Sequence, residues 1–135
     1  MKSYKNLEIY NLSFDLAIKT HKLSLTLPKY ELYEIGSQVR RSSQSIKDNI
    51  VEGYGRRTYK NEFIRYLIFS HASLLEATSQ LEMIKALYQK EGTVELILEY
   101  DQLGKKIYAF ISYVSSNWKS GQKPTTDNRQ PTTDN

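Results

Sequence analysis

The sequence contains no cysteine, and this absence excludes disulfide bonds, thiolate metal ligands and a cysteine nucleophile. No apolar run approaches the roughly 20 residues that a helix needs to span a bilayer. The N-terminal segment MKSYKNLEIYNLSFDL lacks the uninterrupted apolar core of a signal peptide. Together these absences lead us to expect a cytoplasmic protein with no membrane partner.

Catalytic and metal-binding motifs are missing as well. The sequence has no HExxH, P-loop, GxSxG or dinucleotide-binding motif. His21 and His71 each have isoleucine three positions earlier, where di-iron helical proteins place glutamate. We interpret His21 as a core or boundary side chain, and no two carboxylates are spaced as an acid and a base. We therefore expect no enzyme activity, metal, cofactor or small-molecule substrate.

The length and composition fit one folded domain followed by a tail. A chain of 135 residues can bury a sizeable core, and 39% hydrophobic with 25% charged residues is typical of soluble globular proteins. Residues 121–135, GQKPTTDNRQPTTDN, repeat PTTDN, contain two prolines and have no apolar anchor. We expect this segment to be a disordered low-complexity tail, which leaves residues 1–120 as the domain.

Helical periodicity divides the domain into four segments, and no segment shows convincing strand alternation. We predict helices over residues 7–26, 36–54, 59–90 and 94–119. The predicted N-caps are Asn6, Thr58 and Thr93, and the predicted helix stops are Pro28, the pair Gly53 and Gly55, and Gly92. Four helices with short loops predict an all-α, up-down-up-down four-helix bundle.

Each predicted helix has an apolar face. In helix 7–26 that face contains Leu7, Tyr10, Phe14, Ala17, Ile18, His21 and Leu25. In helix 36–54 it contains Val39, Ser42, Ser43, Ile46, Ile50, Gly53 and Tyr54. In helix 59–90 it contains Phe63, Tyr66, Leu67, Ser70, Leu74, Ala77, Thr78, Leu81, Ile84 and Tyr88. In helix 94–119 it contains Leu96, Tyr100, Leu103, Ile107, Phe110, Ile111, Val114 and Trp118.

Two of these helices have more apolar residues than one core requires. Helix 7–26 has a second stripe of Ile9, Leu12, Leu16 and Leu23. The far side of helix 59–90 carries Ile68, Phe69, Ala72, Leu75, Met83 and Leu87. A second stripe left in water would be an unusually large apolar patch, so we interpret the excess as a subunit interface. The alternative is that helix 59–90 lies deep between its neighbours and buries both sides within one subunit.

Glu76 falls beside the second stripe of helix 59–90. A carboxylate next to apolar surface usually has a partner, because an unpaired buried charge is costly. Arg40 or Arg41, from the same or a neighbouring subunit, is a candidate partner, and the alternative is a rim carboxylate in water. Asn49 and Glu52 are candidates for structural hydrogen bonds to a neighbouring helix or to the backbone around Gly53–Gly55.

The segment QVRRSSQSIKDNIVEGYGRR, residues 38–57, is the centre of positive charge. Between residues 36 and 65 seven cations face three carboxylates, and this net charge of +4 equals that of the whole chain. The candidate nucleic-acid contacts are Arg40, Arg41, Lys47, Arg56, Arg57 and Lys60, interleaved with tyrosines that can stack on unpaired bases. The alternative is that these arginines form salt bridges between subunits with Glu52, Glu62 or Glu76.

The stretch LPKYELYEIGSQVRRSSQSIKDNIVEGYGRR, followed by NEFIRYL, resembles the four-helix-bundle proteins encoded in intervening sequences of bacterial 23S ribosomal RNA genes. The most specific residues are Gln38, Arg40, Arg41, Ser45, Ile46, Asn49, Ile50, Glu52, Gly53, Gly55 and Arg56. Ser42-Ser43 depart from the family's usual alanines, and Lys47-Asp48 from its frequent Pro-Ala. The swaps keep small residues inside and polar residues outside, so they leave the expected fold unchanged.

The resemblance implies a closed ring of bundles, commonly a homopentamer, with no known catalytic activity. A ring would repeat the basic segment on one rim and strengthen its field. We therefore expect a non-enzymatic homo-oligomer that binds RNA or another nucleic acid, mainly electrostatically, through the six cations. The alternative is a protein–protein adaptor or scaffold whose arginines join its own subunits.

Overall fold

The computed structural model describes residues 3–120, and all regular structure within that range is helical. Its elements are the 3-10 turns η1 (Tyr4–Asn6) and η2 (Lys29–Glu31) and the helices α1 (Glu8–Ser24), α2 (Ile35–Gly55), α3 (Lys60–Tyr88) and α4 (Thr93–Asn117). The expected all-α class with four long helices is confirmed for the described residues. The tail expected over residues 121–135 lies outside them.

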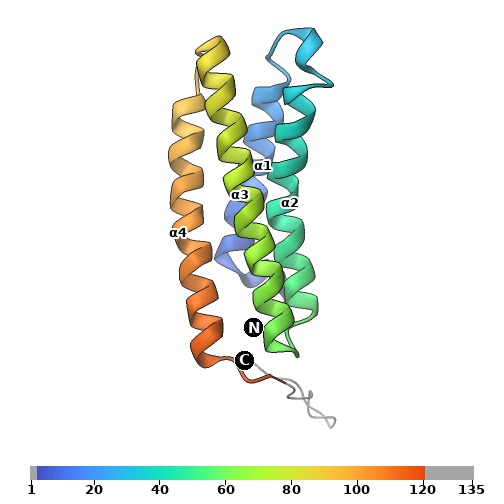
Figure 1. Cartoon of the computed structure of the whole chain (residues 1–135), viewed down its shortest axis with the longest axis vertical. Helices are drawn as coiled ribbons and strands as arrows, with labels where there is room; N and C mark the ends of the chain where they lie inside the picture. Colours follow the sequence, from blue (N-terminus) through green and yellow to red (C-terminus); the bar gives the residue numbers. More distant parts are fainter. Residues whose placement is uncertain (1–2, 121–135) are drawn as a thin grey trace.

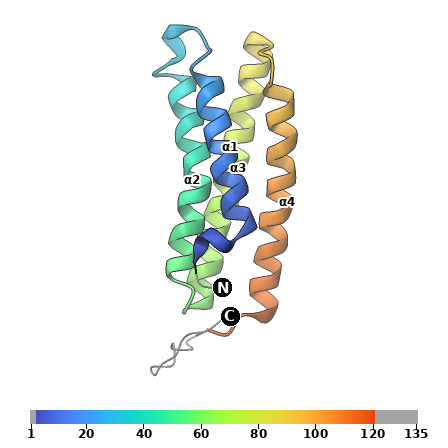
Figure 2. The same ribbon diagram turned by 180° about the vertical axis from the view of Figure 1, so that it is seen from behind.

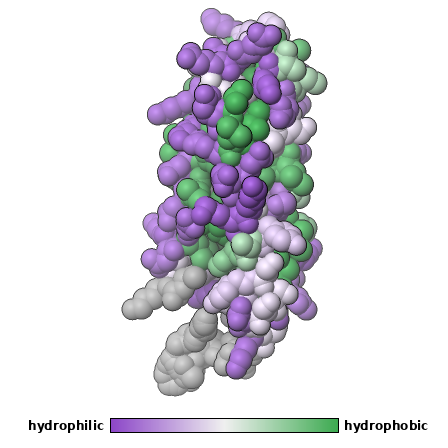
Figure 3. Space-filling view, turned by 90° about the vertical axis from the view of Figure 1, so that its left-hand side faces the viewer, coloured by the Kyte–Doolittle hydropathy of each residue, from purple (hydrophilic) through white to green (hydrophobic). Residues whose placement is uncertain are grey.

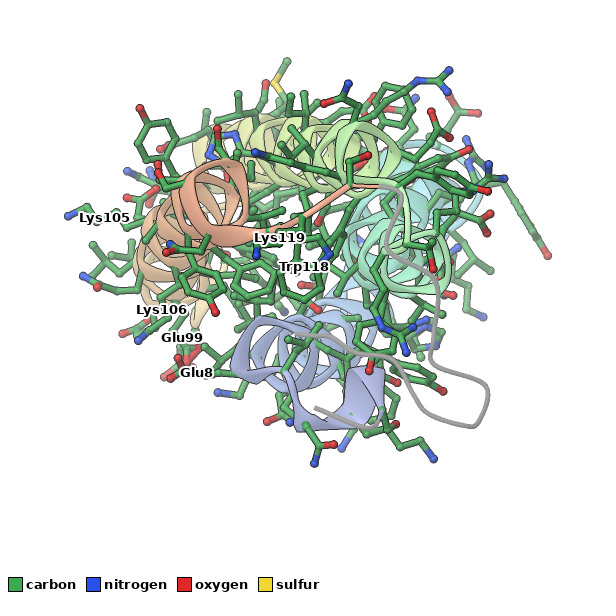
Figure 4. All side chains as sticks on the ribbon, turned by 90° about the horizontal axis from the view of Figure 1, so that it is seen from below. Glu8, Glu99, Lys105, Lys106, Trp118 and Lys119 are labelled. Carbon is green, nitrogen blue, oxygen red and sulfur yellow. The ribbon has the colours of Figure 1, made fainter. Side chains whose placement is uncertain are left out.

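The four helices lie side by side, and consecutive helices run in opposite directions (Figure 1). α2 contacts α1 and α3, and α4 contacts α3 and α1. α3 faces the viewer in Figure 1 and α1 faces the viewer in Figure 2, and the view along the helices places these two at opposite corners (Figure 4). We call the end that holds the α2–α3 turn the lower end, as drawn in Figure 1.

The helix starts differ from the predicted caps. α1 is preceded by Leu7 rather than Asn6, because Asn6 belongs to η1. α3 is preceded by Tyr59 rather than Thr58, and α4 by Gly92 with a φ of 88°. Gly92 takes the left-handed conformation that glycine tolerates best, and it links α4 to the preceding turn rather than ending α3.

The prediction that Gly53 and Gly55 end the helix by taking the left-handed conformation is wrong. Both glycines lie inside α2, and Gly92 is the only glycine with positive φ among the described residues. A Cβ on Gly53 would lie 3.0 Å from the Cβ of Tyr66 and 3.3 Å from Phe63. Gly53 therefore lets α2 approach α3 closely, whereas a Cβ on Gly55 would meet nothing within 4 Å.

The core confirms the inner faces predicted for α2, α3 and α4. Every residue predicted to face inward on these helices is buried or half-buried. Serines occupy the α2–α3 contact: Ser70 Oγ donates to the Ile46 carbonyl at 2.7 Å, and Ser42 Oγ donates to Gln80 Oε1 at 2.5 Å. These small side chains satisfy their own hydroxyls while they keep the two helices close.

α1 is rotated relative to the prediction. Its stripe of Ile9, Leu12, Leu16 and Leu23, expected to be the extra one, is buried or half-buried. From the face expected inside, Phe14, Ile18 and Leu25 are 41%, 43% and 56% exposed. His21 is exposed too, so its interpretation as a core or boundary side chain is wrong.

Small polar residues complete the inner side of α1. Ser13, Thr20 and Ser24 are buried. The Thr20 hydroxyl lies 2.6 Å from the Tyr100 hydroxyl, and Ser13 donates to the Tyr10 carbonyl at 2.9 Å. Because these hydroxyls are satisfied, they can be buried at little cost, and α1 presents its small polar face to the core.

The seam between α1 and α4 is the most open helix contact. Two grooves follow it, one of about 450 Å³ near Leu23 and Leu96 and one of about 500 Å³ near Ile9 and Phe110. Two exposed ion pairs cross it: Lys19 to Glu99 at 2.9 Å, and Lys106 to Glu8 at 3.3 Å. Figure 4 shows Lys106 on the α4 side and Glu8 on the α1 side of this seam, with Trp118 between the helices at the lower end.

Candidate interaction surfaces

The six cations predicted to contact nucleic acid do not form one patch. Arg40 lies on α2, and Arg56 follows its last residue, 16 positions later, which corresponds to about 24 Å along a helix. Lys47 lies on the α1 side of α2, where it lines a groove with Phe14 and Ile18. Arg56 lies on the α3 side, where it pairs with Glu62. The cations therefore spread along and around α2.

Arg40 is a structural residue in this fold. Its half-buried guanidinium donates to Ser24 Oγ at 2.9 Å and to the Leu32 carbonyl at 2.7 Å. These bonds tie the end of α1 and the following loop to α2. Arg41 is exposed and donates to Ser37 Oγ of its own helix at 2.7 Å.

Arg56 is at the centre of an ionic cluster on the α2–α3 side. It binds Glu52 at 2.9 Å and Glu62 at 3.2 Å, and Arg65 binds Glu62 at 3.4 Å. Its guanidinium also lies over the ring of Tyr66, 4.8 Å from the centroid. The hydrogen bond to Glu52 raises the pKa of Arg56 above its ordinary value. A phosphate at Arg56 would have to compete with these two carboxylates.

Arg57 and Lys60 lie at the α2–α3 turn. The Arg57 guanidinium lies 4.0 Å above the centroid of Tyr54 and donates to the Tyr54 carbonyl at 3.0 Å. The Arg57 carbonyl accepts a 2.7 Å hydrogen bond from the Trp118 indole. Lys60 is half-buried and donates its backbone N–H to Ser120 at 3.2 Å. Tyr59, between the two cations, is 61% exposed.

Two predicted polar residues of α2 bind within their own helix. Lys47 pairs with the adjacent Asp48 at 2.8 Å. The Asn49 amide donates to the Ser45 carbonyl at 2.9 Å and the Ser45 hydroxyl at 3.0 Å, rather than to the Gly53–Gly55 backbone. Ser45 in turn lies 2.8 Å from the Ser73 hydroxyl of α3, so Asn49 supports the α2–α3 contact indirectly.

The outer side of α3 carries an apolar stripe, which the exposed residues Glu76 and Ser79 interrupt between Leu75 and Met83. We define the α3 stripe as the exposed residues Ile68, Phe69, Ala72, Leu75, Met83 and Leu87. Its five large side chains are 40–58% exposed, so the alternative that α3 buries both sides within one subunit is wrong. On the α4 side, apolar patches are likewise interrupted by hydrophilic side chains (Figure 3).

Glu76 lies beside this stripe and is exposed. Within residues 3–120 it makes no ion pair, and the two arginines proposed as its partners bind Ser24, Leu32 and Ser37 instead. A partner for Glu76 in the same subunit is therefore not found among the described residues. Its position on apolar surface makes it the charge to consider in any contact with a second copy.

A second apolar surface lies between α1 and α2, and the sequence reasoning missed it. We define the α1 groove, about 210 Å³ in volume, by its lining of Phe14, Ala17, Ile18, His21, Lys22, Gln44 and Lys47. The floor is apolar and the rim is basic. The signal that could have found it is the run of small polar residues Ser13, Thr20 and Ser24, which marks the opposite side of α1 as the buried one.

The described residues show no group of three His, Asp or Glu side chains placed to hold a metal ion. Across residues 3–120, no helix is long and apolar enough to cross a membrane.

Comparison with known protein families adds one match. The family model for 23S rRNA-intervening sequence proteins matches residues 5–109, which include α1, α2, α3 and most of α4. A search of curated proteins finds no match to the sequence.

Proposed function

The chain belongs to the family of 23S rRNA-intervening sequence proteins, and from that premise we propose that it is a self-assembling, non-enzymatic scaffold. In this proposal the four helices form a closed up-down-up-down bundle, and copies of the bundle join into a ring. Five copies is the number that the family resemblance implies. The observation that carries the proposal is the α3 stripe, an apolar helix face exposed to water in the single chain.

The size of the stripe indicates what a partner must provide. Complete burial of a large aliphatic or aromatic side chain stabilises by about 1.5–3 kcal/mol, so finishing the burial of five half-exposed ones gives roughly 5 kcal/mol. Association costs about 4–15 kcal/mol in lost translational and rotational freedom. One stripe therefore offsets only the lower end of this cost, and a partner face that is apolar as well adds the stabilisation that a stable assembly needs.

The arginine contacts favour this scaffold over a purely RNA-binding protein. Arg56 already binds two carboxylates, and Arg40 binds a hydroxyl and a carbonyl. Exposed ion pairs contribute little to stability, but they do reduce the charge that a polyanion meets. These pairs lie within one subunit, whereas the adaptor hypothesis placed them between subunits.

Light scattering tests the scaffold directly. We expect wild-type protein to have a mass that is a multiple of 15.7 kDa, and Leu75→Asp to have the mass of one chain. Leu75 is 58% exposed, so the substitution leaves the core intact, which circular dichroism checks. A wild-type mass of 15.7 kDa at high protein concentration would contradict the proposal.

The α2–α3 turn supports a second candidate function, nucleic-acid binding at the lower end. Tyr59 is 61% exposed between Arg57 and Lys60, and a tyrosine flanked by cations suits stacking on an unpaired base beside a phosphate. A ring would repeat this end on one rim. Of the six candidate nucleic-acid contacts, this proposal keeps Arg57 and Lys60. Arg41 and Lys47 lie too far along α2 to contact the same ligand.

Fluorescence anisotropy with a structured RNA tests this site. We expect Arg57→Ala with Lys60→Ala to weaken binding and to reduce the slope of log affinity against log salt by about 1.5. The control is Lys85→Ala with Lys105→Ala, which removes two cations elsewhere. Equal losses in both double variants, or binding that does not respond to salt, would remove the lower-end site and leave the scaffold proposal unaffected.

A further inference from the structure

The molecule has two apolar surfaces that the four-helix core does not use. They are the α3 stripe and the α1 groove. Leu25, which follows α1 and is 56% exposed, does not line the groove. Figure 4 places α1 and α3 at opposite corners, and the α1 groove also includes Gln44 and Lys47 of α2, so the two surfaces lie on different sides of one molecule. A single copy cannot bring them together.

Both surfaces follow the spacing of a helix-packing seam. On α1 the apolar side chains Phe14 and Ile18 are four residues apart, and Leu25 follows seven residues later. On α3 the stripe runs from Ile68 to Ala72 and Leu75, with intervals of four and three. Intervals of four and three keep side chains on one line along a helix, which lets two helices interlock.

The charges on the two surfaces are complementary. Glu76 lies on the α3 stripe, and Lys22 and Lys47 form the rim of the α1 groove. In the part of the chain that the structure describes, neither Glu76 nor Lys22 has an ion-pair partner. Four other charges on α3 are matched locally, since Arg65 binds Glu62 and Lys85 binds Glu82 at 3.7 Å, while Lys60 lies at the far end of the helix from the stripe's centre.

Pairing each surface with itself fits less well. Glu76 lies near the middle of the stripe, which extends from Ile68 to Leu87. An antiparallel pair of α3 helices related by a two-fold axis would therefore bring the two Glu76 carboxylates close together. Two α1 grooves in contact would oppose their lysines in the same way. Like charges in contact disfavour both arrangements, and unlike pairing removes the conflict.

We infer that the α3 stripe of one copy docks into the α1 groove of a second copy, with Glu76 meeting Lys22 and Lys47. This inference rests on the proposed self-assembly and names its two surfaces. Each contact then joins unlike faces, so copies add head to tail, and the series ends when a ring closes.

Two half-blocked variants test the inference. Leu75→Asp blocks the stripe and leaves the groove intact, and Ile18→Asp blocks the groove and leaves the stripe intact. Both side chains are exposed, at 58% and 43%, so the fold tolerates the changes. Alone, each variant is expected to have a mass of 15.7 kDa by light scattering. An equimolar mixture is expected to form a heterodimer of twice that mass and nothing larger.

The outcomes separate the two proposals. A monomeric wild type overturns both self-assembly and this docking mode. If the wild type assembles, two results overturn the docking mode and leave self-assembly standing. One is that Ile18→Asp alone still dimerises, and the other is that the mixture stays monomeric at the highest soluble concentration. Leu98→Asp on α4, where Leu98 is 59% exposed, is the control and should assemble as wild type does. Met83→Asp on the stripe and Phe14→Asp in the groove, at 53% and 41% exposed, repeat the test should either first variant fold poorly.

A charge swap tests the polar contact. Glu76→Lys and Lys22→Glu are each expected to lower the association constant up to about fivefold, which is the range of exposed ion pairs. The double variant is expected to recover part of that loss, because it restores the pair at positions 76 and 22 with reversed sign, whereas Lys47 then faces a like charge. Losses that simply add in the double variant would overturn the contact between Glu76 and Lys22.

Discussion

The two sides of α3 carry similar aliphatic and aromatic side chains in opposite surroundings. On the inner side, Phe63, Leu67, Leu81 and Ile84 are fully buried. On the outer side, Ile68 and Leu75 are more than half exposed. Apolar character alone therefore does not separate a residue that holds the fold from one that is available to a partner. Position around the helix does, and the same substitution on each side should give different results.

The largest contrast is expected between Leu67→Ala and Leu75→Ala. Leu67 has no exposed surface, so its truncation leaves a cavity and should lower the free energy of unfolding by about 2–5 kcal/mol. Leu75→Ala should change the stability of the isolated chain by less than about 0.5 kcal/mol. Urea unfolding in dilute solution measures both. Equal losses would mean that the outer side of α3 is part of the monomer core.

The pH dependence of the unfolding free energy tests the buried side of this comparison, because Tyr100 is a buried titratable residue. Burial raises the pKa of Tyr100 to about 12 from an ordinary value of 10.0, despite its hydrogen bond to Thr20. The folded state therefore keeps this proton at pH values where the unfolded state loses it. Its stabilisation is complete below pH 10 and disappears as the pH rises to 12, a loss of about 3 kcal/mol.

The matched control is Tyr100→Phe, followed by urea unfolding across the same pH range. The difference in unfolding free energy between wild type and variant should shrink or change sign between pH 10 and pH 12. The exposed tyrosines, such as Tyr33, contribute equally to both proteins and cancel in this difference. A difference that stays constant with pH would show that Tyr100 ionises as an exposed tyrosine does.

A smaller effect is expected from two glycines of α2. Gly53→Ala places a Cβ against the Tyr66 and Phe63 side chains of α3, and overpacking of this kind should cost about 1–3 kcal/mol. Gly55→Ala meets nothing within 4 Å and should be neutral or stabilise by up to about 1 kcal/mol, since alanine favours helix. Thermal unfolding of the pair decides whether α2 and α3 need this close approach.

The sequence predicts three of the four helix orientations because their inner faces are marked by large aliphatic residues. α2 is recognisable from Ile46 and Ile50, even though serines fill its remaining inner positions. α1 was misjudged because periodicity counts apolar residues, whereas its buried face includes Ser13, Thr20 and Ser24. Ser13 and Ser24 donate to carbonyls three residues earlier in α1, so any helix could bury them at little cost. The partner of Thr20 is Tyr100 of α4, which only the folded structure supplies.

The candidate surfaces were predictable to different degrees. The α3 stripe follows from spacing alone. The pair of Glu52 and Arg56 was also accessible, because residues four apart on a helix are neighbours. The contacts of Arg40 with Ser24 and Leu32 depend on how the loop after α1 folds back, which no local pattern encodes. The α1 groove was missed because the rotation of α1 was misjudged.

The open seam between α1 and α4 has a consequence for motion. The contact between α1 and α4 contains two grooves and exposed ion pairs, so it is less tightly packed than the contact between α2 and α3. Local opening follows the weakest packing in a protein. We expect the amide protons of α1 and α4 to exchange with solvent sooner than those of α2 and α3, because α2 and α3 make the most extensive helix contact.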